Sequence, residues 1–167
     1  MKKRLALLLA LAAGTAAAQE GRPVSYGKLL DLIGTAQRRV LVYVPYLSDA
    51  HLANALRAAA VDSARRVRVV VLTVPFFAAK EDSLTNSLAL AGAGVVEAQV
   101  NSTTAYVLVD DNLFTSAQLG RTASVTDLRV LPRTASNTFL TWYMGALKAG
   151  RTVTSYEAFI RIGGRLK

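Results

Sequence analysis

The stretch TTAYVLVDDNLFTSAQLG, residues 103–120, has the residue types and the order of a catalytic strand followed by a turn. Alternating apolar residues lead to two acids, Asp110 and Asp111, and a small-residue turn then carries Ser116 and Gln118. A serine or threonine hydroxyl is a weak nucleophile unless an adjacent base activates it. The stretch contains hydroxyls and acids but neither histidine nor lysine, so it has the shape of a reactive site without the usual reacting groups.

The rest of the sequence offers few alternatives for catalysis. His51 is the only histidine, and it lies early in a predicted helix, where it is either a recruited base or an exposed or packing side chain. The acids show no metal-binding spacing, because Asp110 and Asp111 are adjacent and on a strand would point to opposite faces. There is no glycine-rich phosphate loop and no G-x-S-x-G turn. We therefore expect neither a metal nor a cofactor.

Aromatic residues follow two of the predicted strands. Tyr46 comes shortly after one strand, and Phe76 and Phe77 come shortly after the next. Together with Lys80 and Tyr106 they predict an aromatic, partly basic rim at the carboxyl ends of these strands. Nucleic acid bases stack on such rings while cations follow the phosphates. The alternative is that the phenylalanines pack against a neighbouring helix or a second copy of the chain.

A predicted alternation of helices and strands positions these residues. Apolar residues at three- and four-residue spacing predict helices, and continuous apolar runs ended by proline predict buried strands. The expected helices are 25–37, a helix beginning after 48–49, 83–91, 137–148 and 156–162. The expected strands are 40–44, 66–74, 95–100, 105–109, 113–115 and 128–131. A strand, a crossover helix and a strand in that order imply a parallel pair.

Positive charge predominates along the chain. The sequence has 20 Lys and Arg against 11 Asp and Glu, a formal net charge of +9. Such an excess favours anionic partners such as nucleic acid or a phosphate polymer. The basic runs 38–39 and 65–68 lead into predicted strands, so we interpret their arginines as solvated charges at the amino ends of those strands. Ligands of open α/β sheets bind at the opposite, carboxyl ends.

The first 18 residues have the order of a secretory signal peptide, with three basic residues, an apolar run at 5–13 and small residues before Gln19. We expect residues 19–167 to form a single domain that is secreted or periplasmic. No later stretch is apolar over the roughly 18 residues that a membrane span requires. The sequence has no cysteine and therefore no disulfide.

The order of these elements, with the 103–120 stretch, resembles one half of a phospholipase D-like phosphodiesterase over residues 26–131. That family carries an HxKxxxxD strand motif followed by a turn of the GSxN type. Residues 115–119 are similar to the turn, with threonine for its glycine and glutamine for its asparagine. The resemblance implies an α/β half-domain with a mixed, largely parallel sheet flanked by helices.

The strand motif lacks both of its reacting residues. With Asp111 as the motif acid, Thr104 stands in place of histidine and Tyr106 in place of lysine. Shifting the motif so that Asp110 is the acid places a threonine and an alanine there instead. In the family one histidine attacks phosphorus, a histidine of the other half protonates the leaving oxygen, and lysines hold the phosphate charge. A threonine hydroxyl and a phenol supply neither function.

We therefore predict an exported, catalytically inactive phospholipase D-like domain that binds nucleic acid or another phosphate polymer. Thr104, Ser116, Gln118 and nearby cations would hold the ligand. A chain with one half implies a homodimer. One alternative is an active phosphodiesterase or nuclease, with an unrecognised nucleophile or with histidines from a different chain. The other is a scaffold that uses the former active face to bind a protein.

Overall fold

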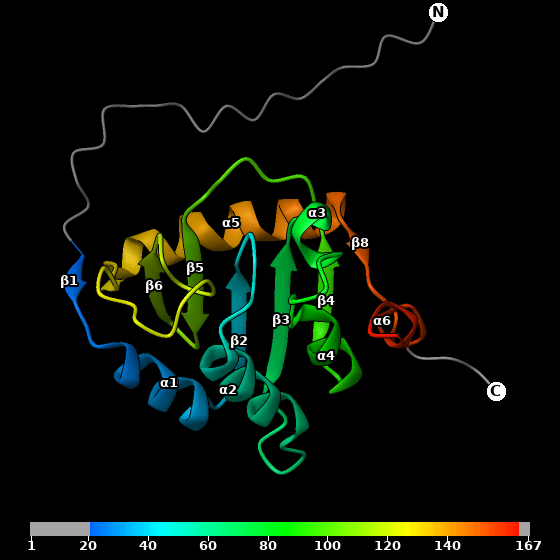
Figure 1. Ribbon diagram of the computed structural model, residues 1–167. Coiled ribbons are helices and arrows are strands. Elements are labelled where there is room, and N and C mark those ends of the chain that lie inside the picture. The colour runs from blue at the N-terminus through cyan, green and yellow to red at the C-terminus, as the bar shows by residue number, and fades with distance from the viewer. Residues whose placement is uncertain (1–20, 164–167) are drawn as a thin grey trace, which may run out of the picture.

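The computed structural model describes residues 21–163, which form one mixed sheet with helices on both faces (Figure 1). The strand order across the sheet is β1-β7-β6-β5-β2-β3-β4-β8. The strands are β1 (Arg22–Pro23), β2 (Arg39–Tyr43), β3 (Arg68–Thr73), β4 (Gly94–Glu97), β5 (Ala105–Val109), β6 (Asn112–Ser116), β7 (Arg129–Val130) and β8 (Arg151–Thr152). The predicted signal peptide lies outside the described residues.

The helices divide between the two faces of the sheet (Figure 1). They are α1 (Tyr26–Thr35), α2 (Ala50–Val61), α3 (Pro75–Ala78), α4 (Thr85–Leu90), α5 (Arg133–Ala149) and α6 (Ser155–Arg161). Buried residues of α1, α2, α4 and α6 share one core cluster with the sheet. The long helix α5 contributes to a second cluster on the other face. Burial on both faces explains why the central strands read as continuous apolar runs.

The parallel strands β2, β3 and β4 form the centre of the fold. β2 and β3 pair in register from Arg39 and Arg68 to Tyr43 and Leu72, and α2 makes the crossover between them. Asp49 caps α2, because its carboxylate accepts the backbone N–H of His51 at 2.9 Å. Because the strands are parallel and in register, the segments that leave them begin at the same edge of the sheet.

Helix α5 is fixed to the sheet by a buried tyrosine. The Tyr143 side chain is fully buried, and its hydroxyl lies 3.1 Å from the carbonyl oxygen of Val42 and 2.9 Å from that of Val70. These carbonyls belong to β2 and β3, so one phenol O–H is shared between the two central strands. Burial raises the pKa of Tyr143 well above its ordinary value, and the phenol stays neutral.

A two-residue turn joins β5 to β6, and it is held by an acid. Asp110 has a φ of +52°, and its carboxylate accepts the backbone N–H groups of Gln37, Arg38 and Arg39 at 3.1, 2.8 and 3.1 Å. Asp110 and Asp111 therefore lie between the two strands, as the predicted bounds 105–109 and 113–115 imply. The left-handed conformation of Asp110, which Asp tolerates better than most residues, closes the hairpin.

Most predicted elements are confirmed, including 105–109 to the residue, and the helix predicted at 137–148 is part of α5, which begins earlier, at Arg133. The sheet is mixed as predicted, but parallel pairs do not predominate. Only β2–β3 and β3–β4 are parallel, and the other five described pairs are antiparallel. The predicted strand 95–100 ends earlier, at Glu97. The short elements β1, α3 and β8 were not predicted, because two to four residues carry no periodicity.

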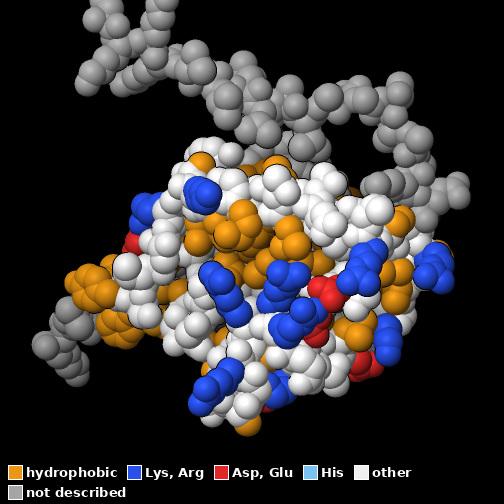
Figure 2. All heavy atoms as spheres, turned by 180° about the vertical axis from the view of Figure 1, so that it is seen from behind, with side chains coloured by type: hydrophobic (Ala, Val, Ile, Leu, Met, Phe, Trp, Pro, Cys, Tyr) orange, Lys and Arg blue, Asp and Glu red, His pale blue; other side chains and the backbone are white. Residues whose placement is uncertain are grey.

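The arginines that precede β2 and β3 lie at the amino ends of these strands, as predicted. Arg38 and Arg39 both form ion pairs with Asp111, at 2.6 and 3.4 Å, and Arg65 pairs with Asp62 at 2.6 Å. Viewed from behind, the surface carries many Lys and Arg side chains around an apolar centre and few acidic ones (Figure 2). Among the helices of residues 21–163, none is long and apolar enough to cross a membrane.

The contacts of Asp110 lead to a pH-dependent prediction. Burial alone would raise the pKa of Asp110, but the three backbone N–H donors outweigh it, so the pKa lies below its ordinary value. At pH 7 we expect Asp110→Asn to lower the free energy of unfolding by about 1 kcal/mol, because solvent screens this half-buried turn. Urea unfolding at several pH values measures it.

The sign of the pH effect follows from the lowered pKa. The ionised carboxylate stabilises the native state fully above the pKa of an unfolded aspartate, about 3.9. The stabilisation is lost as the pH falls through the lower pKa of the native state, so the wild type and Asp110→Asn should converge at acid pH. Asp31→Asn, at an exposed position in α1, is the control. An equal effect of the two substitutions at pH 7 would contradict the assignment.

Candidate functional site

The carboxyl edge of β2 and β3 gathers the loops that carry most of the predicted site residues. The Thr73 hydroxyl at the end of β3 donates to the carbonyl oxygen of Pro45 at 3.1 Å, and both groups are buried. The backbone N–H of Leu84 donates to the carbonyl oxygen of Leu47 at 2.8 Å. These two bonds join the β2–α2 loop to the β3–α4 segment, so Tyr46 and the residues of α3 are held next to each other.

Four side chains at this edge form what we call the Lys80 cluster: Tyr46, Phe76, Phe77 and Lys80. The ring centroids of Tyr46 and Phe77 are 5.7 Å apart, and those of Phe76 and Phe77 are 5.2 Å apart. The Lys80 ammonium lies 5.4, 5.6 and 5.2 Å from the centroids of Tyr46, Phe76 and Phe77. Three aromatic faces therefore attract one ammonium group, as cation–π geometry requires.

The Lys80 cluster is open to solvent on one side. Phe76 is 71% exposed, which is unusual for a phenylalanine, and Lys80 is exposed as well. The Tyr46 hydroxyl donates to Asp82, and this hydrogen bond is the main reason why the pKa of Tyr46 is raised. Asp82 thereby fixes the tyrosine ring. Within residues 21–163 Lys80 forms no ion pair, so its charge is available to an anion.

Ser116 and Gln118 organise the β6–β7 loop from inside. The Ser116 side chain is buried, donates to Asp127, and accepts the backbone N–H of Gln118 at 2.9 Å and of Leu119 at 3.0 Å. The Gln118 side-chain oxygen accepts the backbone N–H of Thr126 at 2.8 Å. Both side chains hold the ends of the loop together. The Ser116 hydroxyl is occupied by these internal hydrogen bonds, so a ligand would contact the surface of the loop and not this hydroxyl.

Gly120 brings this loop against the Lys80 cluster. Its carbonyl oxygen accepts the backbone N–H groups of Ser48 and Asp49 at 2.8 and 3.0 Å. Gly120 has a φ of +83°, and a Cβ at this position would lie 2.8 Å from the carbonyl oxygen of Tyr46. Only glycine fits such a backbone approach. The loop of Ser116 and the segment of Tyr46 are therefore neighbours at one edge of the sheet.

Thr104 and Tyr106, the motif positions, lie near the start of β5 at the same edge. Thr104 is half-buried, and within residues 21–163 its hydroxyl makes no hydrogen bond. The prediction that Tyr106 belongs to the same aromatic rim as Lys80 is wrong. The Tyr106 ring instead packs on the α5 face, 5.7 Å from Phe139 and 6.3 Å from Trp142. Strand alternation explains this, because successive β5 side chains point to opposite faces.

Asp111 is distant from these residues, since the hairpin turn lies at the opposite edge of the sheet. It pairs with Arg38 and Arg39 there. In the motif the acid is seven residues after the histidine position, so a strand of this length necessarily separates the two. Asp111 therefore stabilises the scaffold and does not share a cleft with Thr104.

The other possible base, His51, is exposed in the first turn of α2. Its imidazole makes no hydrogen bond to another side chain in the described part of the chain, and so no histidine–hydroxyl pair is formed there. The same part of the chain contains no group of three or more His, Asp or Glu side chains that could hold a metal ion. The arrangement provides rings, hydroxyls and cations, which bind phosphates and bases.

Arg121 is a residue that sequence reasoning missed. It follows Gly120 in the β6–β7 loop, and its charge acts on the hydroxyl of Tyr43 at the end of β2. Burial raises the pKa of Tyr43 to about 12, while the Arg121 charge acts in the other direction. The Tyr43 hydroxyl donates to the carbonyl oxygen of Ser102 at 2.6 Å. Arg121 adds a second cation to the edge that carries Lys80. In the sequence, the only signal for Arg121 as a site residue is its position shortly after the GSxN-like turn at 115–119.

Comparison with known proteins identifies the fold. No protein-family model matches the sequence, and no curated protein matches it. Nuc from Salmonella typhimurium, a phospholipase D family member, aligns with a TM-score of 0.65 at 18% identity, covering 77% of this chain and 90% of Nuc. NucT from Helicobacter pylori aligns with a TM-score of 0.61 at 13% identity, over 76% of this chain and 89% of NucT.

A third solved structure is TrmBL2, an archaeal chromatin protein with a novel mode of DNA binding. It aligns with a TM-score of 0.54 at 14% identity, over 75% of this chain but only 50% of TrmBL2. At these identities the three alignments establish the fold alone. They confirm the phospholipase D-like fold that the order of elements and the 103–120 stretch predict.

The buried hydrogen bonds of Ser116 predict a measurable loss of stability. We expect Ser116→Ala to lower the free energy of unfolding by about 1–3 kcal/mol, because Asp127 and two backbone N–H groups lose their partner. Ser124→Ala, in the same loop but exposed, should change it by less than about 0.5 kcal/mol. Urea denaturation of the three proteins measures both effects. Equal stability of wild type and Ser116→Ala would show that the hydroxyl does not hold the loop.

Proposed function

We propose that this chain, whose fold is the phospholipase D-like fold, binds nucleic acid or another phosphate polymer at the carboxyl edge of its parallel strands and does not hydrolyse it. The ligand would lie over the Lys80 cluster, Thr104 and the Ser116 loop. The export and the homodimer that the sequence predicts are part of this proposal.

The Lys80 cluster is the observation that carries the proposal. Its exposed Phe76 ring offers a stacking surface, and the Lys80 ammonium lies beside that ring at 5.6 Å from the centroid. Single-stranded nucleic acid needs these two elements, an aromatic face for a base and a cation for the adjacent phosphate. Arg121 lies in the neighbouring β6–β7 loop, where its positive charge would contact further phosphates of the bound strand.

The absence of turnover is inferred from the groups at the motif positions. Thr104 and Tyr106 provide a hydroxyl and a phenol where the related enzymes use an imidazole and an ammonium group. Neither accepts a proton near neutral pH, and a neutral phenol adds no positive charge to stabilise a pentavalent phosphoryl group. The described residues hold no histidine beside a hydroxyl that could replace them.

The structural neighbours support a ligand of the nucleic acid class. TrmBL2 is a chromatin protein that binds DNA, and Nuc is a member of the phospholipase D family. With the predicted signal peptide removed, 17 Lys and Arg against 11 Asp and Glu leave a net charge of about +6, which favours the same class of ligand because bound polyanions release their counterions. The fold, the charge and the exposed rings thus favour the same type of partner.

Binding to a fluorescent oligothymidylate tests the role of the Lys80 cluster. Phe76→Ala should weaken binding about tenfold, since stacking of one base contributes about 1–3 kcal/mol. Lys80→Gln should weaken it several-fold at low salt and reduce the slope of log affinity against log salt. The matched controls are Tyr156→Ala and Lys148→Gln, which remove an exposed ring and an exposed cation elsewhere. Both should bind like the wild type.

Two results would contradict the binding proposal. One is an affinity for oligothymidylate that stays the same from about 50 mM to about 300 mM salt, because phosphate contacts should weaken over this range. The other is an equal effect of Phe76→Ala and Tyr156→Ala. The molar mass of the same samples by light scattering should be that of two copies, as the predicted homodimer requires.

Hydrolysis of a chromogenic phosphodiester and of DNA tests the second part of the proposal. We expect no turnover above a buffer blank, with or without EDTA, because the chain provides no activated nucleophile at the edge. The competing hypothesis is an active phosphodiesterase that uses an unrecognised group. Turnover in the wild type that is lost in Thr104→Ala or His51→Ala, and kept in Ser124→Ala, would establish that enzyme instead.

A further inference from the structure

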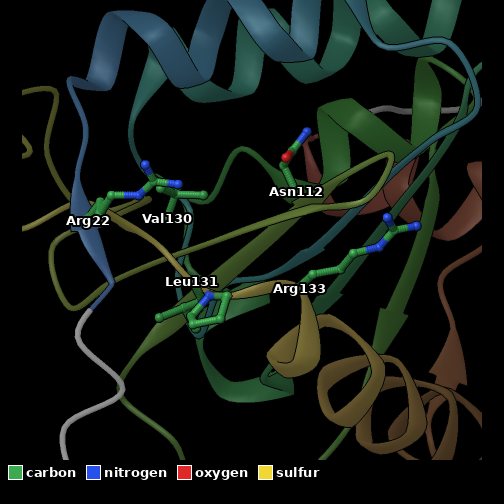
Figure 3. Close-up of a pocket in the computed structure, with 6 residues that line it drawn as sticks. Arg22, Asn112, Val130, Leu131 and Arg133 are labelled. Atoms are coloured by element: carbon green, nitrogen blue, oxygen red, sulfur yellow. The ribbon is translucent and has the colours of Figure 1, made fainter.

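A pocket of about 300 Å³ lies at the opposite edge of the sheet from the Lys80 cluster (Figure 3). Its lining residues are Arg22, Asn112, Val130, Leu131, Pro132 and Arg133. They come from four elements or their ends: the edge strand β1, the start of β6, the strand β7 with the two residues after it, and the first residue of α5. Nothing in the proposed function involves this pocket.

Two backbone contacts and one side-chain hydrogen bond form the pocket. β1 pairs with β7, so that Arg22 lies opposite Val130. The backbone N–H of Leu131 donates to the carbonyl oxygen of Leu113 at 2.8 Å, which joins the end of β7 to β6. The Ser136 hydroxyl donates to the carbonyl oxygen of Asp111 at 3.2 Å and holds the first turns of α5 against the hairpin. Arg22 and Arg133 are thus positioned by ordered elements.

Figure 3 shows the polar side chains around the pocket. Arg22 and Arg133 lie on opposite sides of it, Asn112 lies between them, and Leu131 is on the remaining side. The side chains of Arg22, Asn112 and Arg133 therefore share the lining of this hollow with three apolar residues, Val130, Leu131 and Pro132. The lining contains no carboxylate.

The nearby acid is already neutralised by other arginines. Asp111, next to Asn112 in the hairpin, pairs with Arg38 and Arg39. Within residues 21–163 neither Arg22 nor Arg133 forms an ion pair. Two unpaired like charges that flank one hollow repel each other, and an anion between them would remove that repulsion. The pocket is therefore electrostatically complementary to an anion.

We propose that this pocket binds the phosphate group of a phosphate ester. Guanidinium groups match phosphate oxygens with paired N–H donors, and the Asn112 amide adds a further donor. The apolar side chains of Val130, Leu131 and Pro132 provide a surface for the organic part of the ester. The phosphate would come from a free nucleotide or from the end of a nucleic acid strand. This site is distinct from the carboxyl edge and does not depend on the function proposed there.

Nuclear magnetic resonance of the ¹⁵N-labelled chain tests the proposal with four probes: inorganic phosphate, adenosine 5′-monophosphate, adenosine, and a 5′-phosphorylated oligothymidylate. The three phosphate-bearing probes should shift the Asn112 side-chain amide and the backbone amide of Arg133, and adenosine should not. Tighter binding of the oligonucleotide than of the monophosphate, measured from the shift of the Asn112 side-chain amide, would identify a strand end as the ligand of this pocket. Equal affinity would identify a free phosphate ester.

Charge-matched variants separate this site from general attraction. Arg22→Gln/Arg133→Gln should weaken adenosine 5′-monophosphate binding at least about tenfold, since charge-assisted hydrogen bonds are lost. Lys28→Gln/Lys148→Gln removes the same charge from exposed positions and should retain the wild-type affinity within about twofold. The proposal is overturned by equal losses in the two double variants, or by an unshifted Asn112 amide at saturating monophosphate.

Discussion

The in-register parallel pairing of β2 and β3 is the constraint on which the other features depend. It starts with Arg39 opposite Arg68 and ends with Tyr43 opposite Leu72, so both strands reach the same edge. The bond from Thr73 to Pro45 then fixes the two departing segments to each other. Tyr46 and Phe77 are thereby held in ring contact, and the third ring and Lys80 follow in the same short segment. A slip of the pairing would move these side chains apart and turn the strand side chains to the wrong faces.

The hairpin of β5 and β6 extends the sheet and gives it two functionally different edges. At one edge, Asp110 binds three backbone N–H groups before β2, and Asp111 pairs with two arginines. At the other, Ser116 and Gly120 fix the β6–β7 loop against the β2–α2 loop. Acids elsewhere are also used internally: the Glu97 side chain is 2% exposed and binds Arg151 and Arg161. These acids are thus paired within the scaffold, whereas Lys80, Arg22 and Arg133 form no ion pair within residues 21–163.

The phospholipase D-like fold of this chain contains a hydrogen-bonded turn after β6. In this turn Ser116 accepts two backbone N–H groups and binds Asp127. That turn is needed for the loop to fold, whether or not phosphate is cleaved nearby. The Thr104 hydroxyl makes no hydrogen bond within residues 21–163. Tyr106 packs against Phe139 and Trp142.

The sequence alone determined the helices and the long strands, the missing reactive groups and the basic charge. These properties follow from local periodicity and residue type, as the helix that ends at Gly150 and the strand 105–109 illustrate. Tertiary structure alone decided that five of the strand pairs are antiparallel, that Tyr106 faces α5, and that Arg121 joins the carboxyl edge. It also brought Arg22 and Arg133 to one pocket. The physical reason is that periodicity specifies which side of an element is buried, whereas strand pairing and loop closure between distant segments specify which side chains meet.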